Sequence, residues 1–80
     1  MIAPHKYLNI ELSVINTGAI IIKYLNQDNA VHFDDMLQRL TVDIGPGASK
    51  LFIPSLSFLY LLGVVRFNSE SDSIEIIHEA

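Results

Sequence analysis

Few residues in this sequence have the type and spacing that catalysis or metal binding requires. His5, His32 and His78 lie far apart in the chain and have none of the spacings typical of a metal site. Asp34 and Asp35 are adjacent, so on a helix their side chains point about 100° apart and cap or solvate the helix instead of sharing a proton. The chain has no cysteine, which excludes disulfides, thiolate zinc sites and cysteine nucleophiles.

The remaining chemical motifs are equally sparse. The segment Gly45-Pro46-Gly47 lacks the Lys and the Ser/Thr of a P-loop, and its proline removes a backbone N–H that a phosphate would need. No arrangement of Ser, His and Asp is typical of a nucleophile elbow. We therefore expect no enzymatic activity, no cofactor and no metal, and we expect a binding function instead.

Composition indicates one small folded domain with excess apolar surface. The chain has 80 residues, half of them hydrophobic, with 5 Lys and Arg against 9 Asp and Glu and a net charge of -4. A domain of this size buries only about 60% of its unfolded surface. The longest uncharged stretch, residues 51–65, contains Pro54 and Gly63 and is shorter than the roughly 20 residues of a membrane span. The first residues do not resemble a signal peptide, so we expect a cytoplasmic protein without membrane contact.

Hydrophobic spacing predicts three helices, at residues 12–26, 34–40 and 49–62. Ser13 and Asp34 are expected N-caps, and Gly63 is expected to end the third helix. A short strand is predicted at residues 30–33, and a hairpin at residues 64–68 and 73–78. Residues 1–11 are predicted to be a docking arm, because Pro4 argues against a helix that starts before it and because Tyr7, Leu8 and Ile10 are too apolar for a solvated tail. This order predicts a single α+β domain over residues 1–80, a small winged helix-turn-helix with three helices and a C-terminal β-hairpin.

The predicted third helix is apolar around most of its circumference, and such a helix must be buried on all sides. So small a domain is expected to cover one side of it, drawn from Leu51, Ile53, Leu56, Phe58 and Leu62. The other side, with Phe52, Leu59 and Tyr60, is then an exposed patch that contacts a partner. Tyr7 and Leu8 of the arm complete the predicted partner-binding set. The alternative is a fully central helix, covered on its second side by the arm and the hairpin.

The same helix argues against DNA binding, the usual function of a winged helix. Residues 51–62 include no charge, Asn or Gln with which to read a major groove. The hairpin carries Arg66 but also four acidic residues, Glu70, Asp72, Glu75 and Glu79, where phosphate contacts need cations. We expect no sequence-specific nucleic-acid binding. A winged-helix DNA-binding transcriptional regulator remains the alternative function, and a homo-oligomeric scaffold formed through the spare face of the third helix remains a third.

Three segments resemble a known family. Residues 1–6 (MIAPHK) and 14–20 (VINTGAI) resemble the opening of the small middle components of prokaryotic ABC-three-component conflict systems, in particular the middle component 6 group. Residues 51–65 (LFIPSLSFLYLLGVV) resemble their last helix and the start of the wing. The resemblance implies a non-catalytic adaptor between a Rad50- or SMC-like ABC ATPase and an effector, often a nuclease, as in Lamassu-type antiphage defence. On this interpretation the ATP and DNA chemistry belongs to the partners.

Overall fold

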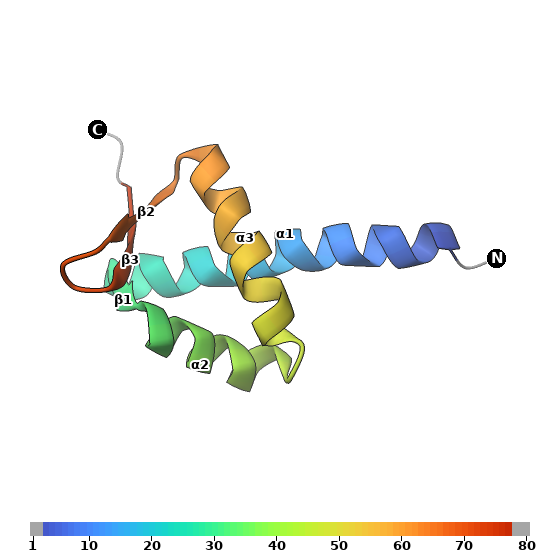
Figure 1. Ribbon diagram of the computed structural model, residues 1–80, viewed down its shortest axis with the longest axis horizontal. Helices are drawn as coiled ribbons and strands as arrows, with labels where there is room; N and C mark the ends of the chain where they lie inside the picture. Colours follow the sequence, from blue (N-terminus) through green and yellow to red (C-terminus); the bar gives the residue numbers. More distant parts are fainter. Residues whose placement is uncertain (1–2, 78–80) are drawn as a thin grey trace.

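The computed structural model describes the backbone of residues 3–77 and the side chains of residues 12–77. The elements follow in the order α1 (Ala3–Asp28), β1 (Ala30–His32), α2 (Phe33–Ile44), α3 (Ala48–Leu62), β2 (Val65–Asn68) and β3 (Ser73–Ile76). Figure 1 shows α3 crossing α1, with α2 below this crossing and the strands at the C-terminal end of α1. The fold is α+β, as predicted, and its layout is compatible with a winged helix-turn-helix.

The three strands form one antiparallel sheet in the order β1-β3-β2. The central strand β3 places Ile74 opposite Val31 of β1 and Phe67 of β2. Ile74, Val31 and Val65 are buried, so one face of the sheet closes the core. The short strand and the hairpin expected from the sequence are therefore parts of one sheet.

The expected start of the first helix is wrong, because α1 begins at Ala3 and runs for 26 residues. Pro4 lies in its first turn, where the backbone N–H needs no helical partner and proline is tolerated. Ser13 is therefore inside the helix and not its N-cap, and residues 3–11 are helical turns instead of an irregular arm. The N-terminal half of α1 projects beyond the other elements (Figure 1). Tyr7 and Leu8 belong to this half by backbone, and their side chains lie outside the described residues.

The second helix is longer than predicted, spanning Phe33–Ile44, and its N-cap is His32, not Asp34. The expected end of α3 is confirmed, since Gly63 adopts a left-handed conformation with φ of 76°. The Gly63 and Val64 N–H groups donate to the carbonyls of Tyr60 and Leu59, which closes the helix and directs the chain into β2.

The α1–α3 crossing depends on a small residue and a buried polar contact. A Cβ on Gly18 would lie 3.5 Å from Leu59 Cδ2, so the Leu59 side chain packs directly over this glycine. The hydroxyl of the fully buried Ser55 donates to the Val14 carbonyl at 3.3 Å. These contacts fix the side of α3 that faces α1. The core is completed by side chains from every element, including Ile21, Leu25, Val31, Met36, Leu40, Phe52, Leu56, Val65 and Ile74.

A polar cluster centred on Tyr24 joins α1 to α2. The Tyr24 side chain is buried, and its hydroxyl donates to the Asp43 carboxylate. Arg39 lies over the Tyr24 ring, 5.7 Å from its centroid, and pairs with Asp28 at 2.8 Å. Burial, and then the hydrogen bond to Asp43, raises the pKa of Tyr24 to about 12.

This pKa shift predicts a loss of stability at alkaline pH. The folded protein holds the Tyr24 proton more tightly than the unfolded chain, whose tyrosine titrates near 10. The free energy of unfolding should therefore fall as pH rises from about 10 to about 12, by no more than about 3 kcal/mol. Urea unfolding at pH 8 to 12 checks this for the wild type and Tyr24→Phe. The phenylalanine variant should lose less stability over the same range, whereas identical pH profiles would contradict the assignment.

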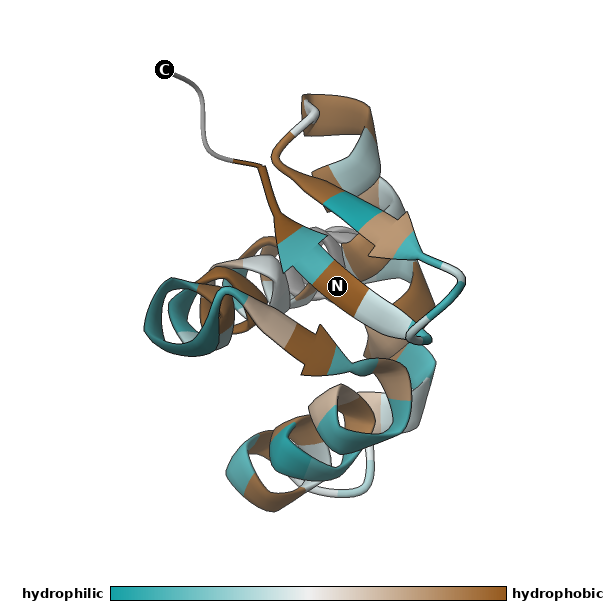
Figure 2. Ribbon diagram, turned by 90° about the vertical axis from the view of Figure 1, so that its left-hand side faces the viewer, coloured by the Kyte–Doolittle hydropathy of each residue, from teal (hydrophilic) through white to brown (hydrophobic). Residues whose placement is uncertain are grey.

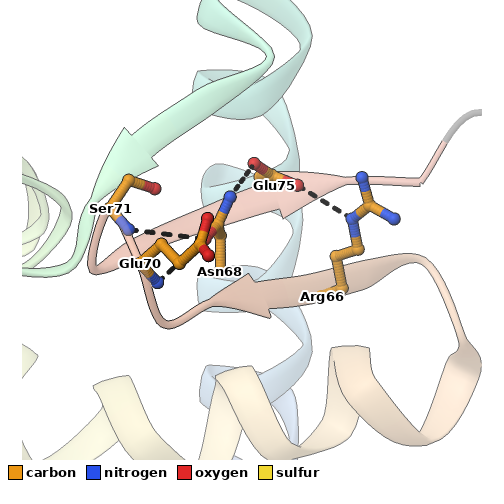
Figure 3. Close-up of polar contacts among 5 residues, drawn as sticks. All are labelled: Arg66, Asn68, Glu70, Ser71 and Glu75. Carbon is orange, nitrogen blue, oxygen red and sulfur yellow. Dashed lines mark hydrogen bonds and ion pairs between the residues drawn. The ribbon is translucent and has the colours of Figure 1, made fainter.

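The hairpin turn is organised by one asparagine and one carboxylate, shown in Figure 3. The Asn68 side-chain oxygen accepts from the backbone N–H groups of Glu70 and Ser71, at 3.0 and 3.4 Å. Its amide nitrogen donates to Glu75 at 3.1 Å, and Arg66 donates to the other carboxylate oxygen at 2.8 Å. The Asn68 and then the Arg66 hydrogen bonds hold the pKa of Glu75 below its ordinary value. The Arg66 side chain therefore pairs with Glu75 within the hairpin of β2 and β3.

Candidate functional site

The third helix has a clearly divided surface. One side is buried against α1, α2 and the sheet through Ala48, Phe52, Ser55, Leu56 and Leu59. The opposite side, which we call the outer face of α3, consists of residues spaced along one stripe of the helix, and all of them are exposed: Ile53, Pro54, Ser57, Tyr60 and Leu61. Leu61 is 88% exposed. A stripe that exposes a tyrosine, an isoleucine and a leucine is unusual for a free surface and typical of a contact region.

The predicted assignment of the two sides of this helix is wrong for Phe52 and Leu59, whereas Leu56, which was expected to be covered, is buried. Phe52 and Leu59 were expected on the exposed patch, but they are only 2% and 4% exposed. Phe52 packs against Phe33, with ring centroids 4.9 Å apart, and Leu59 covers Gly18 of α1. Both therefore hold the core together and cannot contact a partner while the domain is folded.

Of three further residues of this helix, one is placed as predicted and two are not. Tyr60 is exposed, as expected. Ile53 and Leu62 were expected to be covered, and both are exposed. Leu61 is the most exposed large apolar side chain of α3 and was missed as a candidate. Its spacing of four and eight residues from Ser57 and Ile53 could have indicated a shared face, but only the contacts of the opposite side show which face is free.

The apolar surface continues to the C-terminal end of α3. Leu62 is exposed there. Figure 2 shows hydrophobic colour at this end of α3, where the chain turns into β2. The Tyr60 hydroxyl, like that of an ordinary tyrosine, is protonated at neutral pH and can donate a hydrogen bond to a partner. The outer face of α3 is therefore the candidate functional site.

The charges around this face do not form a cationic surface. Lys50 is the only Lys or Arg of α3. Elsewhere in residues 12–77, Arg39 pairs with Asp28 and Arg66 pairs with Glu75, both at 2.8 Å. The outer face of α3 itself carries mainly aliphatic and aromatic groups. This face therefore offers few positive charges that could neutralise the phosphates of a nucleic acid.

The described residues line open hollows besides the outer face of α3, among them one between Asn16 of α1, Ile44 of α2 and Leu51 of α3. They include no group of three or more His, Asp or Glu side chains that could hold a metal ion. A shallow hollow over α2 is lined by residues of that single helix, namely Asp34, Leu37, Gln38, Arg39, Thr41 and Val42. Such a hollow lacks polar groups converging from several elements, as a small-molecule site requires. Within residues 3–77, none of the helices has the length and apolarity needed to cross a bilayer.

Comparison with known families shows the family to which the chain belongs. The family model of the ABC-three component (ABC-3C) system Middle Component 8 matches residues 29–77, which is more than half of the sequence. The protein is an ABC-3C middle component. The family expected from the sequence is thus confirmed, while the group is middle component 8 and not the middle component 6 group. No curated protein and no solved structure matches the chain.

The matched region has a simple relation to the structure of this middle component. It begins after α1 and includes all three strands, α2 and α3. The outer face of α3 therefore lies inside the matched region, whereas α1 lies before it. As a member of an ABC-3C system, this protein works with the other components of that system.

Proposed function

We propose that this middle component is a non-catalytic adaptor of an antiphage defence system, organised as in the Lamassu type. It joins a Rad50- or SMC-like ABC ATPase to an effector subunit such as a nuclease. The outer face of α3 contacts the ATPase. The observation that carries this proposal is the exposed apolar stripe of Ile53, Tyr60 and Leu61, which lies within the residues that the family model matches.

Energetics support the assignment of this face to a protein partner. An apolar side chain that moves from water into an interface gains about 25 cal/mol per Å² of buried apolar area. Tyrosine is enriched among residues that dominate interface energetics, because its ring packs while its hydroxyl keeps a hydrogen bond. Leu61 gives the face an aliphatic anchor and Tyr60 an aromatic one, side by side on the last turn of α3.

Co-purification tests the adaptor function directly. The full-length middle component is co-expressed with the ABC ATPase of its own system, and the tagged ATPase is captured. We expect a stable complex, and we expect the middle component expressed alone to self-associate or aggregate more readily than in the complex. A monodisperse monomer with no affinity for the ATPase would contradict the proposal.

The alternative function, a winged-helix transcriptional regulator, has two observations in its favour. The fold layout is compatible with a winged helix-turn-helix. Lys50 near the start of α3 and the exposed Arg66 of the wing are placed where such a protein uses cations. A gel-shift assay at low salt distinguishes the two functions. The adaptor proposal expects no salt-sensitive duplex binding at micromolar protein, whereas a shift that weakens steeply with salt would support the regulator.

A further inference from the structure

An open hollow of about 250 Å³ lies where α1 faces the junction between α2 and α3. We call it the three-helix hollow. Its apolar walls come from three helices, through Ile20 of α1, Ile44 of α2 and Leu51 of α3. All three side chains are only partly buried, so the domain leaves apolar surface uncovered here. Unlike the hollow over α2, this one is built where several elements meet, which is where binding sites usually form.

Thr17 of α1 lines the same hollow and carries a hydroxyl that the domain does not use. The residue is only 2% exposed, and no hydrogen bond within residues 12–77 involves this hydroxyl. Among these residues, every fully enclosed side-chain oxygen or nitrogen has a partner, so the Thr17 hydroxyl is not fully enclosed. The open space beside Thr17 is the three-helix hollow. A nearly buried hydroxyl without a partner in its own domain adds no stability, which points to a binding role.

The lining restricts what the three-helix hollow can bind. None of the described residues that line it is charged, so an ionised group would lose its hydration there without a counter-charge. A purely apolar group would cover the Thr17 hydroxyl and leave it unpaired, which is also unfavourable. The hollow therefore favours an uncharged group with an apolar body and a polar tip. Ser13 and Asn16 on the same side of the hollow offer further hydrogen-bonding groups to such a tip.

The size of the hollow and these polar groups favour a tyrosine side chain. A volume of about 250 Å³ is below the roughly 300–1,000 Å³ of sites for drug-sized ligands, so the hollow accommodates a single large side chain. A tyrosine ring packs against aliphatic walls, and its hydroxyl both donates and accepts hydrogen bonds. It can therefore pair with the Thr17 hydroxyl in either direction.

We propose that the three-helix hollow receives a tyrosine side chain of the ABC ATPase, whose hydroxyl pairs with Thr17. This inference rests on the proposed adaptor function and adds a second contact to it. Leu51 of the hollow lies one helical turn before Pro54 of the outer face of α3, so the two sites are neighbouring parts of one surface. A side chain carried by a docked protein does not pay separately for lost translational freedom, so a small, open hollow can still add affinity.

Two uncharged probes test the chemistry of the hollow without the ATPase. N-acetyl-tyrosinamide and N-acetyl-phenylalaninamide differ only in the tyrosine hydroxyl, and each is titrated into the full chain while backbone amide signals are followed by NMR. We expect the tyrosine probe to shift the signals of residues around the hollow, such as Ser13, Asn16 and Leu51. It should bind at least about fivefold more tightly than the phenylalanine probe. Equal binding of the two probes, or no shifts around the hollow at about 10 mM probe, would overturn the proposal.

Thr17→Val removes the hydroxyl and keeps the branched shape of the side chain. Because the hydroxyl has no partner in the domain, we expect the free energy of unfolding not to fall. The variant should bind the two probes equally, and it should bind the ABC ATPase at least about fivefold more weakly than the wild type. A purely structural role would give the reverse, with stability lowered and binding unchanged.

Thr41→Val is the matched control, because it makes the same change on α2, at a residue that does not line the hollow. It should bind the ATPase and both probes like the wild type. The inference is overturned if Thr17→Val still prefers the tyrosine probe, loses stability, or binds the ATPase normally. If Leu61→Lys nevertheless weakens ATPase binding, the proposed function stands without the tyrosine contact. If the wild type does not bind the ATPase, the proposed function fails together with this inference.

Discussion

Phe52→Ala is expected to lower the free energy of unfolding by about 3–5 kcal/mol, enough to unfold most molecules of so small a domain. Phe52 is almost fully buried and packs against Phe33 at the junction of α2 and α3. Removing its ring leaves a cavity that neighbouring core residues cannot fill without moving whole helices. Urea or thermal unfolding followed by circular dichroism measures the loss.

Phe67→Ala is the matched control for this prediction. Phe67 also contacts Phe33, with ring centroids 6.4 Å apart, but its side chain is partly exposed on β2. We expect it to cost no more than about 1.5 kcal/mol, because less apolar area leaves the core. Equal destabilisation by the two substitutions would show that Phe52 is not the core residue described here. A stable, fully helical Phe52→Ala variant would restore the prediction that this side of the helix is free.

Leu61→Lys is expected to have the opposite profile, with binding lost and stability kept. Leu61 makes no contribution to the core at 88% exposure, and a lysine near the C-terminal end of a helix interacts favourably with the helix dipole. The free energy of unfolding should change by no more than about 0.5 kcal/mol. If Leu61 is an anchor of the ATPase contact, its loss costs about 2 kcal/mol or more, a reduction in affinity of roughly 30-fold.

Affinity is measured by titrating the ABC ATPase with labelled middle component. Val42→Lys serves as the control for the effect of an added lysine. Both substitutions place a lysine at a highly exposed position of a helix, but Val42 lies on α2, away from the outer face of α3. The control should bind like the wild type. If both variants bind normally, the ATPase contacts another surface; if both lose binding equally, charge and not the apolar face is responsible.

Local signals in the sequence predicted the end of α3 well and the start of α1 badly. Gly63 follows the last apolar residue of its helix and adopts the left-handed conformation that glycine allows, so this boundary is set by a single residue. Pro4 is compatible with either an irregular segment or a first helical turn. The choice between these depends on the turns that follow it, and proline alone cannot decide it.

The face of α3 could not be predicted for a different reason. Apolar residues surround the helix, so its sequence has no polar side to define an orientation. Phe52 is buried because Phe33 lies beside it, and Leu59 is buried because Gly18 lets its side chain approach α1. These contacts join residues distant in sequence. The same holds for β1, which pairs with β3 across more than 40 residues of chain. The sequence predicted that this domain could not cover every apolar side chain of the helix. This part of the prediction is correct, since Ile53, Leu61 and Leu62 remain exposed.

The most direct test of the outer face as a binding surface uses the absence of cysteine in this chain. A Leu61→Cys variant carries a single thiol within the outer face of α3, and its rate of maleimide modification reports the accessibility of that position. We expect fast labelling of the free middle component and labelling slowed at least about tenfold in its complex with the ABC ATPase. A Val42→Cys variant should label equally fast in both states. Undiminished labelling of Leu61→Cys in a complex shown by sedimentation to be intact would contradict the account.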